Sequence, residues 1–428
     1  MTTNHVSSLL INILRSIVLI IGGLVSIVVV FAALTLFVPD KGNSLITIGI
    51  MTWSILGPLF AVASLVVVIV TFVLRKKVKR RFANTTVVLS VLALLSSSGI
   101  VGNFIKATYD NGGSINVLST IWPFSTKPAV PDITETYQVA DGKELKAFVY
   151  KPRIQTIAAP IIMYIHGGGW ISGQGSDLSS IMRWYADQGW LVVSVDYRLA
   201  SDQYATWDKA PADVAYALAW VSKHAEEWGG DNNRLIVMGD SAGGNLAINL
   251  GWAAATNEAM HDGPDSITIP KPRAVVAGYP VVNPGYSYDY GQKWWNDQSP
   301  KDFTADYIGG SPTEHPERLS AISSLTYATP SAPPTLIVAA ENDDFIPAQG
   351  TYEVVQKAKD MGVNITLRKF PSTHHGFDVI PGTLGDMAKK SVVAQFLKEQ
   401  GLGPTTGRRD KNDIMKYHSK RQGSYYEN

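Results

Sequence analysis

Gly239-Asp-Ser-Ala-Gly243 indicates the fold of this chain, because of the segments on either side of it. It follows an apolar run of strand length at 235–238 and opens a helical pattern that starts at Gly244. A strand, a sharp turn and a helix in this order are the context of a nucleophile elbow, whose glycines let the backbone turn without Cβ clashes. The turn lifts the Ser241 hydroxyl above the sheet edge, and the helix N-terminus behind it favours developing negative charge.

The same alternation continues on both sides of this turn. Further apolar runs of strand length lie at 160–165, 190–195, 274–279 and 335–340, and another run, 365–370, precedes His374. Helical patterns lie at 212–223, 244–255, 352–361 and 387–399. Strands that are apolar on both faces suit a parallel sheet covered by helices on both sides. We therefore predict an α/β domain at 131–400, doubly wound around a mostly parallel sheet.

A second glycine-rich stretch, His166-Gly-Gly-Gly-Trp170, follows directly on the predicted strand 160–165. Successive glycines let backbone N–H groups point into a small space, as the oxyanion of an acyl-transfer reaction requires. We assign these donors to the N–H groups of Gly168, Gly169 and Ala242. A phosphate loop or a plain turn is the alternative, and the phosphate loop lacks its usual Lys-Ser/Thr.

Three motifs together carry a family resemblance: the stretch at 166–170, Asp196-Tyr-Arg-Leu-Ala200, and Gly239-Asp-Ser-Ala-Gly-Gly244. Over roughly 131–400 the chain resembles the hormone-sensitive-lipase-like family of α/β-hydrolase esterases. The resemblance implies an α/β-hydrolase fold and hydrolysis of short or medium acyl carboxylic esters through a Ser-His-Asp triad. Family members often carry an N-terminal cap, for which this chain has little room, so the cap gives no substrate inference.

The acid and the histidine of that triad are expected in this chain order after Ser241. Asp343 stands where the family places its acid, on the loop after the predicted strand 335–340, and Asp344 is the alternative. His375 precedes Gly-Phe as the family's histidine does, and His374 is the alternative. No His-Glu-x-x-His or comparable cluster is present, so we expect neither a catalytic metal nor a cofactor.

An aromatic-rich insertion at 283–333 separates the predicted strand 274–279 from the acid loop. It contains Tyr286-Ser-Tyr-Asp-Tyr290 and Trp294-Trp295. Insertions at this place commonly form a lid over the active site, and ordinary packing of surface helices is the alternative.

The N-terminal part, 1–106, holds three long apolar runs at 16–38, 50–74 and 84–105. About 20 apolar residues cross the hydrocarbon core of a bilayer, so we predict three transmembrane helices, with a kink at Gly57-Pro58. The alternatives are buried core helices or, for the first run, a signal peptide, although no small-x-small cleavage site follows it. Transporters place ionisable residues at mid-membrane, and these runs contain none, which indicates an anchor.

Charge orients this anchor. Six of the seven residues at 75–81 are Lys or Arg, whereas the only charged residues in the loop between the first two runs are Asp40 and Lys41. Short basic loops stay in the cytoplasm. We therefore predict an integral protein of the cell membrane whose catalytic domain is extracytoplasmic. Residues 107–130 read as a linker, and the polar tail 401–428 reads as disordered.

Composition limits the remaining functions. The net charge of +1 over 428 residues argues against nucleic-acid binding, and the absence of cysteine excludes disulfides and a thiol nucleophile. The expected partners are the bilayer and an ester substrate, either a small molecule or an acylated glycan or lipid. Two alternatives stay open: an acyltransferase that uses the same acyl-enzyme, and a non-catalytic binding domain on a hydrolase scaffold.

Overall fold

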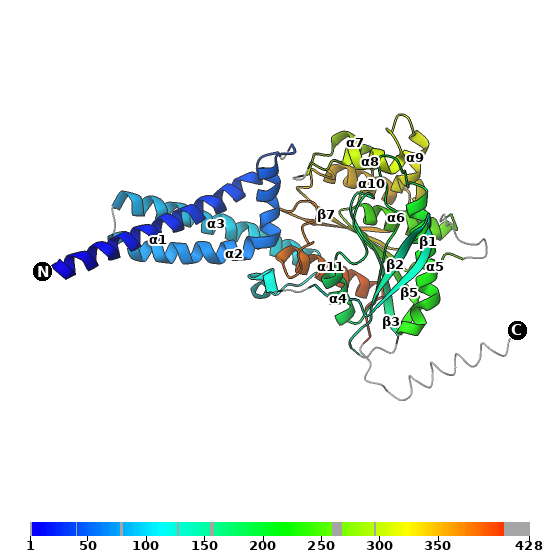
Figure 1. The fold of residues 1–428 in the computed structure, drawn as a ribbon, viewed down its shortest axis with the longest axis horizontal. Helices are drawn as coiled ribbons and strands as arrows, with labels where there is room; N and C mark the ends of the chain where they lie inside the picture. The colour runs from blue at the N-terminus through cyan, green and yellow to red at the C-terminus, as the bar shows by residue number, and fades with distance from the viewer. Residues whose placement is uncertain are drawn as a thin grey trace.

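Three long N-terminal helices form a bundle beside a sheet domain (Figure 1). The computed structural model describes residues 2–39, 41–77, 80–125, 128–154, 158–258, 268–294 and 297–405. The bundle consists of α1 (Thr2–Thr35), α2 (Ser44–Leu74) and α3 (Arg80–Asp110), with the short helix η1 (Arg75–Lys77) after α2. All three are long and apolar enough to cross a membrane, and they contain most of the predicted spans.

The second helix bends between its two ends. Pro58 lies inside α2, where its ring removes one backbone hydrogen bond and kinks the helix. Figure 1 shows the first part of α2 turned across the end of the bundle that faces the sheet domain. The Trp53 indole holds this part in place, because it donates a 3.0 Å hydrogen bond to the carbonyl of Ala32 on α1.

The sheet contains eight strands in the order β1-β2-β4-β3-β5-β6-β7-β8. The pairs β1–β2 and β2–β4 are antiparallel, and every later pair is parallel. The strands are β1 (Ile133–Ala140), β2 (Lys143–Tyr150), β3 (Ala159–Ile165), β4 (Leu191–Val195), β5 (Gly230–Asp240), β6 (Ala274–Gly278), β7 (Thr335–Ala340) and β8 (Ile365–Phe370). The prediction of a doubly wound, mostly parallel sheet is confirmed.

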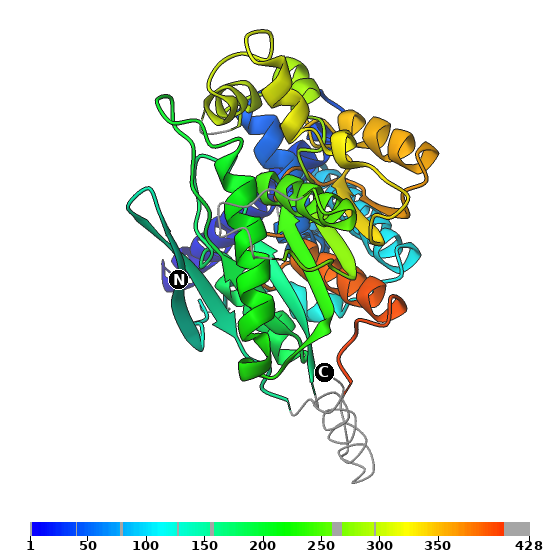
Figure 2. The ribbon, with the colours of Figure 1, turned by 90° about the vertical axis from the view of Figure 1, so that its right-hand side faces the viewer.

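Helices cover both faces of this sheet because strands such as β3 are apolar on both. Ile161 and Met163 pack with α5 (Lys209–His224), α6 (Ala242–Thr256) and α10 (Ala348–Asp360). Ile162 and Tyr164 pack with α4 (Ser179–Asp187) and α11 (Leu384–Glu399) on the other face. In Figure 2, α5 lies in front of the sheet and the bundle lies behind it.

The end of α3 joins the core of the sheet domain. Val101 and Phe104 belong to the same buried cluster as α4 and α11, and the Phe104 ring lies 5.3 Å from that of Phe370. After α3, the Asn111 side chain donates a 2.8 Å hydrogen bond to the Lys369 carbonyl. The segment 107–130, read from composition as a linker, therefore carries the end of α3 and the short helices η2 (Val117–Thr120) and η3 (Pro123–Ser125).

The insertion at 283–333 folds into short helices beyond the sheet, in the yellow region of Figure 1. These are α7 (Pro284–Tyr290), α8 (Pro300–Ile308), α9 (Pro316–Ile322) and η5 (Ser324–Tyr327). Outside the insertion, a further short helix, η4 (Ala225–Trp228), follows α5. The three α-helices each begin with proline, which suits the first turn because its missing N–H has no partner there. Trp295 and residues 406–428 of the predicted disordered tail lie outside the described residues.

Candidate active site

Ser241 occupies the sharp turn between β5 and α6. Its backbone has φ 56° and ψ −121°, a strained conformation for a residue with a side chain. The turn requires glycine at 243, where a Cβ atom would lie 2.2 Å from the Ile165 carbonyl oxygen. The local sequence thus places the Ser241 hydroxyl at the carboxyl edge of the parallel strands, at the N-terminus of α6.

His375 links Ser241 to a carboxylate. Its Nε2 lies 2.8 Å from Ser241 Oγ, and its Nδ1 lies 2.8 Å from Asp343 Oδ2. An ionised carboxylate only accepts, so Nδ1 carries the proton and donates it to Asp343, while Nε2 accepts from the serine hydroxyl. All three side chains are buried, and the Ile346 N–H fixes the other oxygen of Asp343.

The two alternative residues lie elsewhere. Asp344 is half-buried, and its carbonyl accepts a hydrogen bond from Gln292 N–H, while its neighbour Asp343 faces the histidine. His374 is buried with its ring 5.2 Å from that of Trp294. The geometry therefore joins Asp343 and His375 to Ser241, as the family resemblance implies.

Aromatic side chains surround the His375 ring. Tyr279, Phe345 and Trp294 lie with ring centroids 4.7, 5.1 and 6.0 Å away, all edge to face. Such packing fixes the ring orientation and keeps bulk water away from the hydrogen-bonded chain, which strengthens its electrostatic interactions.

The glycine loop after β3 lies directly against Ser241. A Cβ atom on Gly167 would come within 3.3 Å of Ser241 Cβ. Gly168 has φ +110°, and a Cβ there would overlap the Ser172 carbonyl, so this loop conformation requires glycine. Within the described residues, the N–H groups of Gly168, Gly169 and Ala242 donate to no other protein group, so they are available to an oxyanion.

His166 supports this loop from below. Its Nδ1 lies 2.7 Å from the Gly167 carbonyl oxygen, and its ring stacks on Tyr197 at 4.3 Å. Tyr197 OH in turn donates to the His166 carbonyl. Burial lowers the pKa of His166, so the ring is neutral and its Nδ1–H donates to Gly167.

A buried ionic network that the sequence analysis missed lies behind the serine. Lys389 on α11 places its Nζ 2.6 Å from Asp240 Oδ1 and 2.6 Å from Asp378 Oδ2. Tyr164 OH donates to Asp240, and Tyr279 OH donates to Asp378. Burial alone would lower the pKa of Lys389, but the two carboxylates raise it above its usual value, so the ammonium stays charged.

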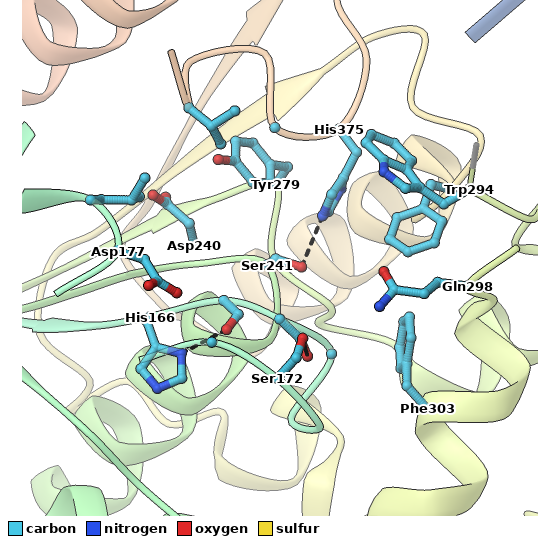
Figure 3. Close-up of a pocket in the computed structure, with 18 of the residues that line it drawn as sticks. His166, Ser172, Asp177, Asp240, Ser241, Tyr279, Trp294, Gln298, Phe303 and His375 are labelled. Carbon is cyan, nitrogen blue, oxygen red and sulfur yellow. Dashed lines mark hydrogen bonds between the residues drawn. The ribbon is translucent and has the colours of Figure 1, made fainter. Parts of the chain in front are cut away.

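A cavity of about 400 Å³ opens over Ser241. Trp294, Gln298 and Phe303, all from the aromatic-rich insertion, line this cavity. Figure 3 shows them to the right of Ser241 and His375. Within the described residues, no group of three His, Asp or Glu side chains is arranged to hold a metal ion. The remaining wall is mostly apolar and includes one residue of the bundle, Met51 on α2.

The sequence is similar to those of known esterases. Residues 148–358 match the family model described as BD-FAE. Esterase LipC of Mycobacterium tuberculosis is 27% identical over 254 residues, which cover 57% of this chain and 59% of LipC. Carboxylesterase NlhH of the same organism is 41% identical over 100 residues, which cover 23% of this chain and 31% of NlhH. The chain thus spans little more than half of LipC and less of NlhH.

Among solved structures, esterase 2 of Thermogutta terrifontis is similar in fold. In its sarin-phosphonylated form it gives a TM-score of 0.53 at 23% identity, covering 64% of this chain and 97% of that chain. This likeness confirms the α/β-hydrolase fold. The match of residues 148–358 to the BD-FAE model and the homology to the mycobacterial esterases confirm the resemblance to hormone-sensitive-lipase-like esterases.

Proposed function

We propose that this protein is a membrane-anchored serine esterase that hydrolyses short or medium acyl carboxylic esters. The observation that carries the proposal is the hydrogen-bonded chain from Ser241 through His375 to Asp343, which opens onto the cavity. Family kinship with esterases supports the same chemistry.

The first half of the mechanism forms an acyl-enzyme. Ser241 Oγ attacks the ester carbonyl while its proton moves to His375 Nε2. Asp343 holds Nδ1–H and stabilises the imidazolium. The N–H groups of Gly168, Gly169 and Ala242 bind the oxyanion, and the tetrahedral intermediate collapses as His375 returns the proton to the leaving alcohol.

The second half releases the acid. A water molecule gives a proton to His375 Nε2 and attacks the acyl carbonyl through the same oxyanion site. Collapse then breaks the bond to Ser241 Oγ, and the serine recovers its proton from His375. The balance is one ester and one water consumed, one carboxylic acid and one alcohol formed.

The experiment uses the full-length protein in detergent, because α3 belongs to the core of the sheet domain. A fluorophosphonate probe should label Ser241, in line with the phosphonylated state named for the Thermogutta esterase. A series of aryl esters should show turnover for acyl chains from acetyl to hexanoyl. Absence of both labelling and hydrolysis would favour a non-catalytic binding domain. Ester formation with an added alcohol that outpaces hydrolysis would favour an acyltransferase.

We also propose that α1–α3 span the cell membrane with the catalytic domain outside. The basic stretch 75–81 supports this orientation, because the insertion machinery retains such loops in the cytoplasm. The chain has no cysteine, so single cysteines can replace Ser114 or Val78, the latter outside the described residues. On intact cells, a membrane-impermeant maleimide should label position 114 and spare position 78. Labelling at 78 alone would reverse the orientation.

A further inference from the structure

The catalytic cavity has a wall that comes from the membrane anchor. Met51 of α2 lines it together with residues of the sheet domain, among them Ser241 and His375. The turn before α2 also approaches the aromatic-rich insertion: a Cβ on Gly42 would lie 3.6 Å from the backbone nitrogen of Lys293. Trp294, next in the chain, lines the same cavity.

Helix length indicates where this wall stands relative to the bilayer. The 31 residues of α2 exceed the roughly 20 that cross a hydrocarbon core of about 30 Å. If about 20 residues before the basic end at Arg75 cross the hydrocarbon core, the membrane-crossing part of α2 begins near Ile55, close to the kink at Pro58. About ten residues remain, and these form the part that turns across the end of the bundle (Figure 1).

The side chains of this first part of α2 fit a position at the bilayer surface. Ile50 and Trp53 are buried, whereas Leu45 and Ile48 are exposed. An apolar face that the protein leaves uncovered suits a helix lying in the interface between headgroups and acyl chains. Met51 thus joins the interface to the cavity.

The cavity offers apolar surface along this route. Met51, Leu178, Phe303, Phe345 and Val379 contribute to its lining, and Val379 is itself exposed. A freely soluble short ester would need no wall from the membrane part of the protein. An ester anchored in the bilayer would need one, because its apolar chains stay covered while its carbonyl moves to Ser241.

We infer that the substrate is the ester of a bilayer-resident amphiphile, which reaches Ser241 from the membrane surface past Met51. This inference rests on the proposed esterase function and on the anchor. It extends the proposed substrates from short and medium acyl esters to lipid esters held in the leaflet on which the catalytic domain sits.

The test compares two esters of the same fluorogenic alcohol, using the full-length protein in phosphatidylcholine vesicles. One is 4-methylumbelliferyl oleate dissolved in the bilayer, and the other is 4-methylumbelliferyl butyrate in solution. We expect wild type to hydrolyse the oleate. We also expect Met51→Trp to lower the ratio of kcat/KM for oleate to that for butyrate at least tenfold, because the larger side chain narrows the route from the bilayer. Ile48→Trp is the matched control on the same helix and should leave the ratio unchanged.

Fluorophosphonate labelling shows that each variant is folded. If Met51→Trp fails to label, Val379→Trp replaces it, because Val379 also lines the cavity on this route, here called the rim. An unchanged ratio in the folded rim variant, or an equal loss in the Ile48 control, would overturn the inference. Hydrolysis of butyrate without hydrolysis of oleate by wild type would also overturn it, while leaving the esterase proposal intact. If wild type hydrolyses neither ester and does not label, the esterase proposal itself fails.

Discussion

Two chains of polar groups connect the turn after β5 with the loop after β8, and they differ in what they leave open. One begins at Ser241, which lines the cavity, and runs through His375 to Asp343. The other centres on Lys389, which both Asp240 and Asp378 hold at 2.6 Å, and both of these carboxylates also accept from a tyrosine. The two chains start at adjacent residues, 240 and 241, and reach the other loop three residues apart, at 378 and 375.

The difference separates chemistry from positioning. A group that reacts must be able to reach the substrate, and Ser241 lines the cavity. A buried charge that does not react must be fully paired, because removing one partner leaves an uncompensated charge in a medium of low dielectric. The second chain therefore sets the relative position of the two loops on which the first chain depends.

The largest effect is expected from breaking the first chain at its nucleophile. Ser241→Ala should lower kcat for aryl esters by about 10⁶-fold, because no other group can form the acyl-enzyme. Initial rates at saturating ester measure this, and an unchanged melting temperature shows that the variant is folded. Wild-type turnover in a folded Ser241→Ala protein would refute the proposed mechanism.

The acid of the first chain should come next. Asp343→Asn should lower kcat by about 10⁴-fold, because an amide holds the imidazole in the wrong tautomer. Asp344→Asn is the matched control one residue away and should cost less than about tenfold, since it does not hold His375. Steady-state kinetics of the two variants decide between them, and the reverse ranking would move the role to Asp344.

Breaking the second chain should act mainly on stability. Lys389→Met leaves two buried carboxylates without their cation, which should destabilise the fold by about 3–5 kcal/mol. It should also lower kcat by roughly 10–100-fold, because the two loops shift relative to each other. Lys390→Met is a control on the same helix, since Lys390 pairs at 2.6 Å with Asp386 and not with the Asp240 network. Equal loss of kcat in both variants would contradict a positioning role for Lys389.

The smallest expected effect is a change in the pH dependence of stability. The folded pKa of Lys389 is raised, so its stabilising contribution is fully present below its usual value of 10.5 and is lost as pH rises through the folded value. Burial also raises the pKa of Tyr164 and Tyr279, which adds a loss of the same sign. Chemical unfolding of wild type and Lys389→Met between pH 9 and 11.5 should therefore show a steeper fall for wild type, by up to about 1.4 kcal/mol per pH unit. If the free energy of unfolding falls equally with pH in both proteins, the pKa of Lys389 is not raised in the folded state.

Most of the parallel strands were predictable, because burial on both faces leaves an unbroken apolar run in the sequence, as in β3 and β7. The two antiparallel strands at one end of the sheet, β1 and β2, were not predicted, because they are partly exposed and carry polar residues such as Glu135 and Lys143. Composition also misled at 107–130, where glycine and proline coexist with the end of α3. The contacts that order this segment, such as Asn111 with Lys369, come from a strand far along the chain.

Short-range constraints were enough to predict the strand–turn–helix around Ser241, the glycine loop after β3, and three helices with uncharged apolar runs. Each follows from steric limits or hydrophobic length within about 20 residues. Three features depend on tertiary packing: the acid that faces His375, the contacts of Lys389 with Asp240 and Asp378, and the presence of Met51 in the cavity wall. Those partners lie 11 to more than 100 positions apart, and no local pattern encodes a contact that depends on how the sheet, α11 and the bundle pack together.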